Sequence, residues 1–346
     1  MFVEPRALTV LLAKLSRSGE VIVPLEKANY LQDYLECRTA AKGGQVLRCQ
    51  DCGTYTVVYN ACNRRGCPVC SRKNQLNWQV RMGRRLLATG HHHLVFSFPG
   101  GLTDQWLKHP RATVARLFKG VRKVICRLER EREVTLGMMM VFQSHCHGLA
   151  YKAHVHCLVT NGGLDEGDQW QPLGTLPLAR MTEWLKQSLG EVGEAKGWQI
   201  HESLHQAGGE AVVQYLGQRL NGSVVTASEV TEHEDRIEIQ VRGGSAGLDR
   251  STFALRYLSH IPQKGTVLVR NCGLYSNRQK RRLQVAREQL GEQSKPDPID
   301  WEERCPRCKG QMQVIMTTLF KPLGFDHERL GFGVDPPYHR ELSKAS

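Results

Sequence analysis

Apolar residues recur along this chain at two spacings, one typical of helices and one typical of strands. Residues 1–45 show helical spacing in "LTVLLAKL" and "LQDYLECRTA", and "AKGG" ends this helical region. Further on, "HHHLVFSFP", "GMMMVFQSH" and "AHVHCLVT" have the character of strands, with a helix at "TVARLFKGVRKVICRLERERE" between the first two. This order predicts the α+β class, with an antiparallel sheet covered by helices.

The second half of the chain continues this mixture. Helices are predicted at "RMTEWLKQSLGEVGEAKG", "GGEAVVQYLGQRLNG" and "STFALRYLSHI", and strands at "DRIEIQVRG" and "GTVLVRNCG". A polar, charged stretch, "QLGEQSKPDPIDWEE", indicates a boundary near residue 289. We therefore expect three parts, which are residues 1–85, 86–288 and 289–346.

The net charge favours a polyanionic partner. The 346 residues include 47 Lys and Arg against 34 Asp and Glu, a formal charge of +13, which favours nucleic acid. No apolar run approaches the roughly 18 to 20 residues that a membrane-spanning helix needs, so no membrane partner is expected. The start, "MFVEPRALTVLLAKLSRSGE", lacks the pattern of a secretory signal, which predicts a cytoplasmic protein.

The 12 cysteines include a dense cluster in "CQDCGTYTVVYNACNRRGCPVC". Two C-x-x-C pairs supply the four thiolates that a tetrahedral zinc ion prefers. Because a cytoplasmic protein is expected to be in a reducing compartment, this spacing favours metal binding over disulfides. The predicted zinc ligands are Cys49, Cys52, Cys67 and Cys70. Cys62, just ahead of the second pair, is an alternative ligand. Arg64 and Arg65 make this module a candidate DNA-contacting surface.

A third C-x-x-C pair, Cys305 and Cys308, stands alone near the end of the sequence. Half a zinc site needs two more ligands, which the sequence does not locate. His327 and His339 are candidates, and the absence of any metal there is the alternative.

Two histidines stand one residue apart in the apolar run "AHVHCLVTNGG". On a strand, His154 and His156 point to the same face, about 7 Å apart, where two imidazoles can bind one cation. Packing in the core is the alternative for this pair. The preceding strand carries Gln143, His145 and His147 at alternate positions, so it offers candidates for a third ligand. Open coordination positions would suit catalysis.

These residues resemble the HUH nucleases, named for a histidine, a bulky apolar residue and a histidine. The order of the C-x-x-C cluster, "HLVFSFP", "AHVHCLVTNGGL", "VVQYLGQRL" and "LVRNCGLYSNR" is similar to that of the rolling-circle transposases of the insertion-sequence ninety-one family and their common-region relatives. The resemblance runs from about residue 20 to about residue 310. It implies an HUH nuclease core in residues 86–288 and a zinc-binding, DNA-contacting module in residues 1–85.

The resemblance implies that Tyr215, in "QYLGQR", attacks DNA and becomes joined to the 5′ phosphate. His154 and His156 would then hold Mg²⁺ or Mn²⁺ at the scissile phosphate. Gln143 is the expected third ligand, and His145 and His147 are the next candidates. Many relatives have a histidine where this chain has Gln143.

The tyrosine helix departs from the family pattern at one position. Many relatives carry a second tyrosine four residues after the first, where this chain has Arg219. We therefore expect a single-tyrosine enzyme in which Arg219 contacts phosphate. Tyr257 and Tyr275 are rival nucleophiles.

The basic segment from Arg270 to Arg282 contains one aromatic residue, a composition that suits single-stranded DNA. The expected DNA contacts there are Arg270, Arg278 and Lys280, and a solvated charged face is the alternative. His93 matches a histidine often seen in relatives, or it only begins a strand.

The expected function is therefore that of a DNA transposase that nicks and rejoins single-stranded DNA through a 5′-phosphotyrosine. The expected cofactors are Mg²⁺ or Mn²⁺ at the histidine pair and Zn²⁺ at the cysteines. A plasmid or phage replication initiator or relaxase with the same chemistry is one alternative, and a non-catalytic zinc-finger DNA-binding protein is another. The partners are DNA at transposon ends and targets, with a homo-oligomer as a further candidate, in a bacterial, nucleoid-associated setting.

Overall fold

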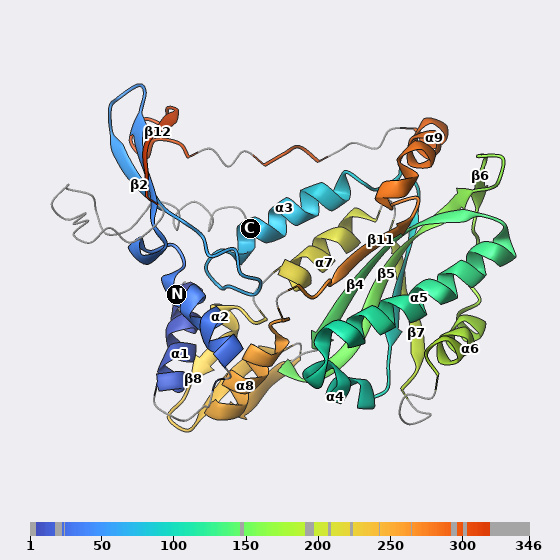
Figure 1. Cartoon of the computed structure of the whole chain (residues 1–346), viewed down its shortest axis with the longest axis horizontal. Helices are drawn as coiled ribbons and strands as arrows, with labels where there is room; N and C mark the ends of the chain where they lie inside the picture. Colours follow the sequence, from blue (N-terminus) through green and yellow to red (C-terminus); the bar gives the residue numbers. More distant parts are fainter. Residues whose placement is uncertain are drawn as a thin grey trace. The chain divides into compact units, whose positions relative to one another are not determined.

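The computed structural model describes residues 5–17, 23, 25–145, 149–190, 197–206, 209–221, 224–241, 243–263, 265–291, 296–299 and 303–318 (Figure 1). The chain divides into two compact units. The first comprises Met1–Asn74, Thr226–Ser228 and Pro298–Ser346, and the second comprises Gln75–Val225 and Glu229–Asp297. This division differs from the three expected parts, because the C-terminal cysteine pair belongs to the same unit as the N-terminal module.

The first unit combines helices with a small sheet. Its elements are α1 (Pro5–Arg17), α2 (Leu25–Glu36), the 3-10 helix η1 (Ala40–Lys42), β1 (Gly44–Cys49), β2 (Tyr55–Tyr59), the 3-10 helix η3 (Ala227–Glu229, whose last residue falls in the second unit) and β12 (Met312–Thr318). The three strands form an antiparallel sheet in the order β12-β1-β2. The helical start predicted from apolar spacing is confirmed by α1 and α2. The stretch "TYTVVYN" between the two C-x-x-C pairs contains β2.

The second unit is built on an antiparallel six-stranded sheet. Its strands are β3 (His91–Ser97), β4 (Thr135–His145), β5 (Tyr151–Leu164), β6 (Trp170–Pro172), β7 (Gln199–Gln206) and β11 (Val269–Gly273). They lie in the order β11-β4-β5-β3-β7, with β6 paired to the end of β5. The strand with the H-x-H motif is therefore central, and its residues 153–160 are buried on both faces of the sheet.

Helices and a second, smaller sheet complete this unit. The helices are α3 (Ser71–Gly83, beginning in the first unit), α4 (Gly101–Lys108), α5 (Pro110–Arg132), α6 (Leu178–Leu189), α7 (Glu210–Asn221), α8 (Arg250–His260) and α9 (Lys280–Leu290), with η4 (Asn277–Gln279) before α9. The smaller sheet is β8 (Val230–Glu232), β9 (Arg236–Val241) and β10 (Gly244–Asp249), paired in the order β10-β9-β8. The α+β class is confirmed.

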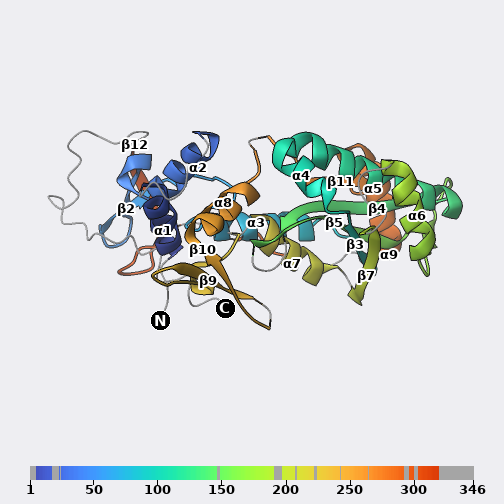
Figure 2. The same ribbon diagram turned by 90° about the horizontal axis from the view of Figure 1, so that it is seen from below.

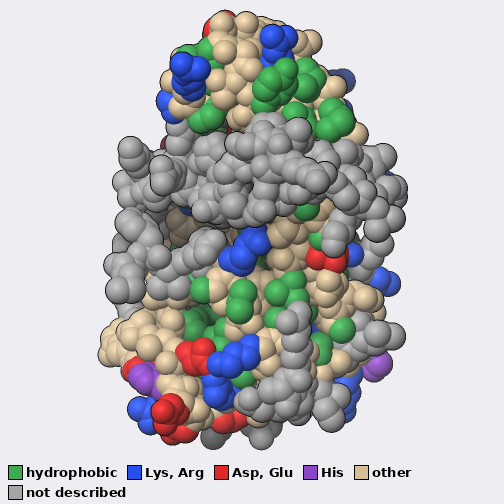
Figure 3. Space-filling model, turned by 90° about the vertical axis from the view of Figure 1, so that its left-hand side faces the viewer, with side chains coloured by type: hydrophobic (Ala, Val, Ile, Leu, Met, Phe, Trp, Pro, Cys, Tyr) green, Lys and Arg blue, Asp and Glu red, His purple; other side chains and the backbone are tan. Residues whose placement is uncertain are grey.

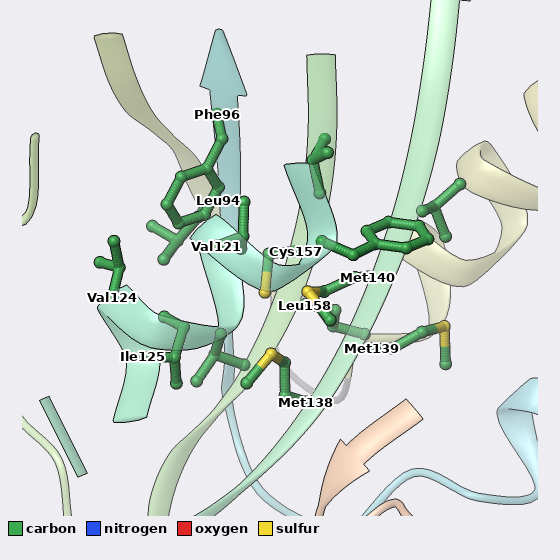
Figure 4. Packing of buried hydrophobic residues seen from close by; sticks show 14 of the residues in the cluster. Leu94, Phe96, Val121, Val124, Ile125, Met138, Met139, Met140, Cys157 and Leu158 are labelled. Atoms are coloured by element: carbon green, nitrogen blue, oxygen red, sulfur yellow. The ribbon is translucent and has the colours of Figure 1, made fainter. Parts of the chain in front are cut away.

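The two faces of the large sheet have different roles. One face packs on α5, where Val121, Val124 and Ile125 meet inward side chains of β3, β4 and β5 (Figure 4). The labelled strand residues of this cluster include Leu94, Phe96, Met138, Met140 and Cys157. The other face carries the histidines, and Figure 2 shows α7 on this side of the sheet, opposite α5. Apolar burial on the α5 face thus fixes the orientation of the histidine face.

Several elements were not predicted from the sequence, among them α4, α9, β1, β6, β7, β8, β10 and β12. The edge strand β7 has the mixed sequence "QIHESLHQ", which offers no clear apolar alternation. In the described part of the chain, no helix has the length and apolar character needed to cross a membrane.

His91 gives the second unit a testable dependence on pH. The ring is buried on β3, its Nε2 lies 2.6 Å from the Tyr275 hydroxyl, and burial lowers its pKa to about 4. The unfolded ring titrates near 6.5, so protonation favours the unfolded chain. The stabilising contribution is complete above about pH 6.5 and is lost as the pH falls toward 4.

We expect wild-type protein to lose roughly 2 to 3 kcal/mol more stability than His91→Gln between about pH 7 and about pH 4.5. Denaturant unfolding of the second unit at both pH values measures this difference. Parallel losses in the two proteins would contradict a neutral, buried His91.

Candidate active site

Three polar side chains converge on one point of the histidine face. The pairing of β4 with β5 places Gln143 opposite His154, and His156 lies two residues further along β5. The Oε1 atom of Gln143 lies 2.9 Å from His154 Nε2 and 3.1 Å from His156 Nε2. All three side chains are buried, with 4 to 9% of each exposed. The structure therefore brings together the two predicted histidines and the predicted third ligand.

The hydrogen bond on the far side of His154 fixes which of its nitrogens carries the proton. Its Nδ1 lies 2.7 Å from the Lys152 carbonyl, which can only accept, so Nδ1 is the protonated nitrogen of the neutral ring. The Nε2 lone pair then faces Gln143 Oε1, which is also an acceptor. In addition, Gln143 Nε2 is buried without a hydrogen-bond partner among the described residues. Two hydrogen-bond acceptors that face each other in a buried place repel, and a cation between them would bind both.

His156 continues into a relay that reaches the edge of the sheet. Its Nδ1 lies 2.9 Å from His93 Nε2, and His93 Nδ1 lies 2.5 Å from Ser203 Oγ. Burial is the main cause that lowers the pKa of His93 to about 4, and the nearby His201 also lowers it. The His93 ring is therefore neutral. The chain can run in two directions, and the one that leaves His156 Nε2 as an acceptor has His156 Nδ1–H donate to His93 Nε2 and His93 Nδ1–H donate to Ser203 Oγ. The Nε2 lone pair of His156 then also faces the common point.

The geometry of this point matches the coordination of a small divalent ion. Neighbouring ligand atoms in an octahedral site with ligand distances of about 2.1 Å lie about 3 Å apart. The separations of 2.9 and 3.1 Å from the Gln143 oxygen agree with this spacing. One amide oxygen and two imidazoles are ligands that Mg²⁺ or Mn²⁺ accepts, and three protein ligands leave positions for substrate. The residues present therefore fit the expected ion.

Tyr215 lies beside this point on α7. The helix buries Val212, Val213, Leu216 and Leu220 at i, i+4 spacing, which places Tyr215 at the edge of the buried face with 40% of the residue exposed. Its ring centroid lies 5.8 Å from that of His156 and 6.3 Å from that of His93. An accessible phenol thus borders a candidate ion site.

Helix α3 supports α7 from the other side. Gln79 Nε2 donates to the carbonyl of Gln214, the residue before Tyr215, at 2.8 Å. Gly217 makes this approach feasible, since a Cβ there would lie 2.5 Å from Gln79 Cγ. Neither Gln79 nor Ser203 was identified from the sequence, because each acts through spatial contact and belongs to no local motif.

The rival tyrosines are enclosed. Tyr257 has 0% of its surface exposed and Tyr275 has 1%. The hydroxyl of Tyr275 accepts from the Leu87 amide at 3.2 Å and contacts His91, and burial raises its pKa above the ordinary value. Neither tyrosine can meet a DNA phosphate without local unfolding.

The reserve ligand His145 does not join the histidine pair. The pairing of β4 with β5 is irregular between Gln143 and His145, and the His145 ring instead lies 4.8 Å from the ring of His260. His147 lies outside the described residues.

The four predicted zinc ligands lie in two clusters, which corrects the expected single site. Thiolates of Cys37, Cys62, Cys67 and Cys70 form one cluster, and those of Cys49, Cys52, Cys305 and Cys308 form the other. Each expected C-x-x-C pair thus finds its partners elsewhere, and β2 separates the two pairs along the chain. Cys62, the expected alternative, is a member of the first cluster. His327 and His339 lie outside the described residues.

Cys37 was missed because a single cysteine at the end of α2 has no neighbouring cysteine to mark it. In the structure its Sγ accepts from the amide of Cys62 at 3.4 Å, and the amide of Arg64 donates to Cys62 Sγ at 3.5 Å. The Sγ atoms of Cys62 and Cys70 lie 3.7 Å apart. Amide donors to sulfur stabilise thiolates, as zinc ligation requires.

Of the two expected DNA-contacting arginines of this module, Arg64 has side-chain partners within it. Arg64 Nε lies 2.5 Å from Asp33 Oδ2, and its guanidinium lies 5.0 Å from the Tyr30 ring centroid. Burial lowers the pKa of Arg65. These contacts give Arg64 a structural role, and the contacts of Arg64 and Arg65 with DNA stay predictions.

The basic residues near the end of the second unit lie apart from the histidine site. Arg270 pairs with Met140 and lies over Phe118 of α5, on the face opposite the histidines. Arg278 lines a cavity of about 1150 Å³ that Glu129 and Asp165 also line. Lys280 is exposed at the start of α9, and the side chain of Arg219 lies outside the described residues.

Comparisons with known proteins identify transposase sequences. The family described as "Transposase zinc-binding domain" matches residues 14–98, and the family described as "Putative transposase" matches residues 137–181 and 176–282. The chain is 24% identical to the putative transposase y4qJ of Sinorhizobium fredii (strain NBRC 101917 / NGR234), over 81% of this chain and 86% of that protein. It is 25% identical to the transposase for insertion sequence element IS801 of Pseudomonas savastanoi pv. phaseolicola, over 70% of this chain and 69% of that protein. No solved structure matches the chain.

The membership of Cys37 in the first cluster can be tested by zinc release. We expect Cys37→Ala to release zinc to a chromogenic chelator as readily as Cys70→Ala, because each removes one of four thiolates. Cys126→Ala, outside both clusters, serves as the control and should release zinc like wild type. Retention of zinc by Cys37→Ala at the wild-type rate would exclude Cys37 as a ligand.

Proposed function

Because the chain belongs to the transposases of the IS91 and IS801 type, we propose that it nicks and rejoins single-stranded DNA through a 5′-phosphotyrosine intermediate, in rolling-circle transposition. The observation that carries this proposal is the accessible Tyr215 ring beside His156, whose Nε2 atom shares one point with His154 and Gln143. A DNA partner follows from the family, whereas the strand chemistry rests on this arrangement.

In the proposed reaction the Tyr215 oxygen attacks phosphorus in line with the bond to the 3′ oxygen. The bond between the phenol oxygen and phosphorus forms, and the bond between phosphorus and the 3′ oxygen breaks. The phenol proton is lost, the leaving 3′ oxygen gains a proton, and the 5′ phosphate stays on the protein. Because one phosphodiester replaces another, a later 3′ hydroxyl can reverse the step and rejoin strands without a nucleotide cofactor.

Gln143, His154 and His156 would hold the divalent ion. Mg²⁺ or Mn²⁺ bound there supplies neutralisation of charge at the scissile phosphate. The Lys152 carbonyl orients the His154 ring, and His93 with Ser203 orients the His156 ring, so that both Nε2 atoms remain acceptors. These neighbours are therefore positioning residues for the proposed site.

A single-tyrosine cycle follows from the sequence of α7. The position one helical turn after Tyr215 is Arg219, which cannot form a second phosphotyrosine. Since Tyr257 and Tyr275 are enclosed, Tyr215 is the nucleophile we propose for both the cutting and the joining step. Arg219, Arg270, Arg278 and Lys280 remain proposed phosphate contacts, with those on β11 and α9 acting outside the cutting site.

The nucleophile can be tested by covalent capture. We expect wild-type protein with Mn²⁺ and labelled single-stranded oligonucleotides that carry transposon-end sequence to form an adduct that survives SDS electrophoresis. Tyr215→Phe should form none, because it keeps the ring and loses the attacking oxygen. Tyr275→Phe is the matched control and should retain the adduct. An adduct formed by Tyr215→Phe would overturn the assignment.

The ion site can be tested by Mn²⁺ binding in the absence of DNA. We expect Gln143→Ala and His154→Ala to weaken Mn²⁺ binding by about 10- to 100-fold or more, because each removes one of three protein ligands. Calorimetry or electron paramagnetic resonance measures the affinity. His145→Ala, nearby but directed toward His260, should bind like wild type. Equal affinity in all four proteins would rule out this ion site.

A further inference from the structure

Two loops of the first unit have the same backbone design, although they lie more than 250 residues apart in the sequence. In one loop the Cys49 amide donates to the Thr54 carbonyl at 2.8 Å, and the Gly53 amide donates to the Cys49 carbonyl at 3.1 Å. In the other, Cys305 donates to Gly310 at 2.9 Å, and Lys309 donates to Cys305 at 2.9 Å.

The residue after the second cysteine of each loop has the same unusual conformation. Gly53 has φ +71° and Lys309 has φ +63°. The left-handed conformation is uncommon for a lysine, so its presence at the matching position shows that the loop is held in a defined shape. Both C-x-x-C sequences therefore form the same tight loop with their two thiolates presented together.

The two loops face each other through their sulfur atoms. The Sγ of Cys49 lies 3.5 Å from that of Cys308, and the Sγ of Cys52 lies 3.5 Å from that of Cys305 and 3.4 Å from that of Cys308. A disulfide needs about 2.05 Å. Four thiolates around one zinc ion at about 2.3 Å lie about 3.8 Å apart, close to the observed spacing. The arrangement matches tetrahedral metal ligation and does not match a disulfide pair.

The strand that follows the second loop has little apolar burial to hold it. On β12, Val314, Ile315 and Met316 are 44, 51 and 43% exposed. At the top of the view in Figure 3, hydrophobic side chains lie at the surface beside Lys and Arg. Figure 1 shows β2 and β12 at this height. A small, exposed edge strand needs another source of stability, and a structural metal is a common one.

We propose that Cys49, Cys52, Cys305 and Cys308 bind a second structural Zn²⁺, which fastens the C-terminal strand β12 to β1. The zinc-binding family match ends at residue 98, so it includes the first cluster and only half of the second. The second ion would join two segments of the first unit that are far apart in the sequence. The entire second unit lies between the pair Cys49 and Cys52 and the pair Cys305 and Cys308 along the chain. The site is independent of the proposed strand chemistry.

The proposal is tested by counting zinc in the intact full-length protein. Native mass spectrometry and elemental analysis should find two zinc ions per chain in wild type. The double variant Cys305→Ser with Cys308→Ser should keep one, and Cys126→Ser with Cys272→Ser, outside both clusters, should keep two. One zinc in wild type, or two in the Cys305 and Cys308 variant, would overturn the proposal.

A second measurement on wild-type protein avoids any loss of folding in the variants. Cobalt substitution should give two Co²⁺ per chain, with the ligand-field and sulfur-to-metal charge-transfer absorption of tetrahedral thiolate sites at twice the intensity of one site. Hydrogen exchange should show residues 312–318 protected in the metal-loaded protein and unprotected after metal removal. Protection of β12 that does not depend on metal would contradict the fastening role.

Discussion

The register between β4 and β5 is the constraint on which the candidate active site depends. It places Gln143 opposite His154 and leaves His156 two residues along the same face. A slip of one residue would turn the Gln143 side chain to the α5 face and would bury polar groups in the apolar core. The packing of Met138, Met140 and Phe142 on the α5 side therefore fixes the position of the polar triad on the other.

The two units of the chain are stabilised by different physical means. The second unit has an extensive apolar core in which long strands and α5 bury complete side chains, so its sheet can carry buried histidines on one face. The first unit has a small sheet whose β2 is half-buried and whose β12 is largely exposed, and it contains eight cysteines in two clusters. Apolar burial in the first unit includes Leu12, Leu15 and Tyr34 of α1 and α2, and cysteine ligation would add stability around the small sheet.

Much of the fold and the central triad could be predicted from the sequence, because their signals are local. Most helices, with the exception of α4 and α9, and the strands β3, β4 and β5 follow from apolar periodicity, and Gln143, His154 and His156 follow from strand alternation together with a family resemblance. The grouping of the cysteines could not be predicted, since Cys37 and the pair Cys305 and Cys308 reach their partners only through the tertiary fold. Ser203 and Gln79 were missed for the same reason. The contacts of Arg64 with Asp33 and Tyr30 also arise only in the tertiary fold, and its contact with DNA stays a prediction.

The central claim is that Tyr215 is the residue that carries DNA. The most direct measurement is peptide mapping by mass spectrometry of the covalent adduct formed by wild-type protein with single-stranded DNA and Mn²⁺, after protease and nuclease digestion. The account predicts that the residual nucleotide is attached to Tyr215 through its phosphate. A nucleotide on Tyr257, on Tyr275 or on a residue outside α7 would contradict it.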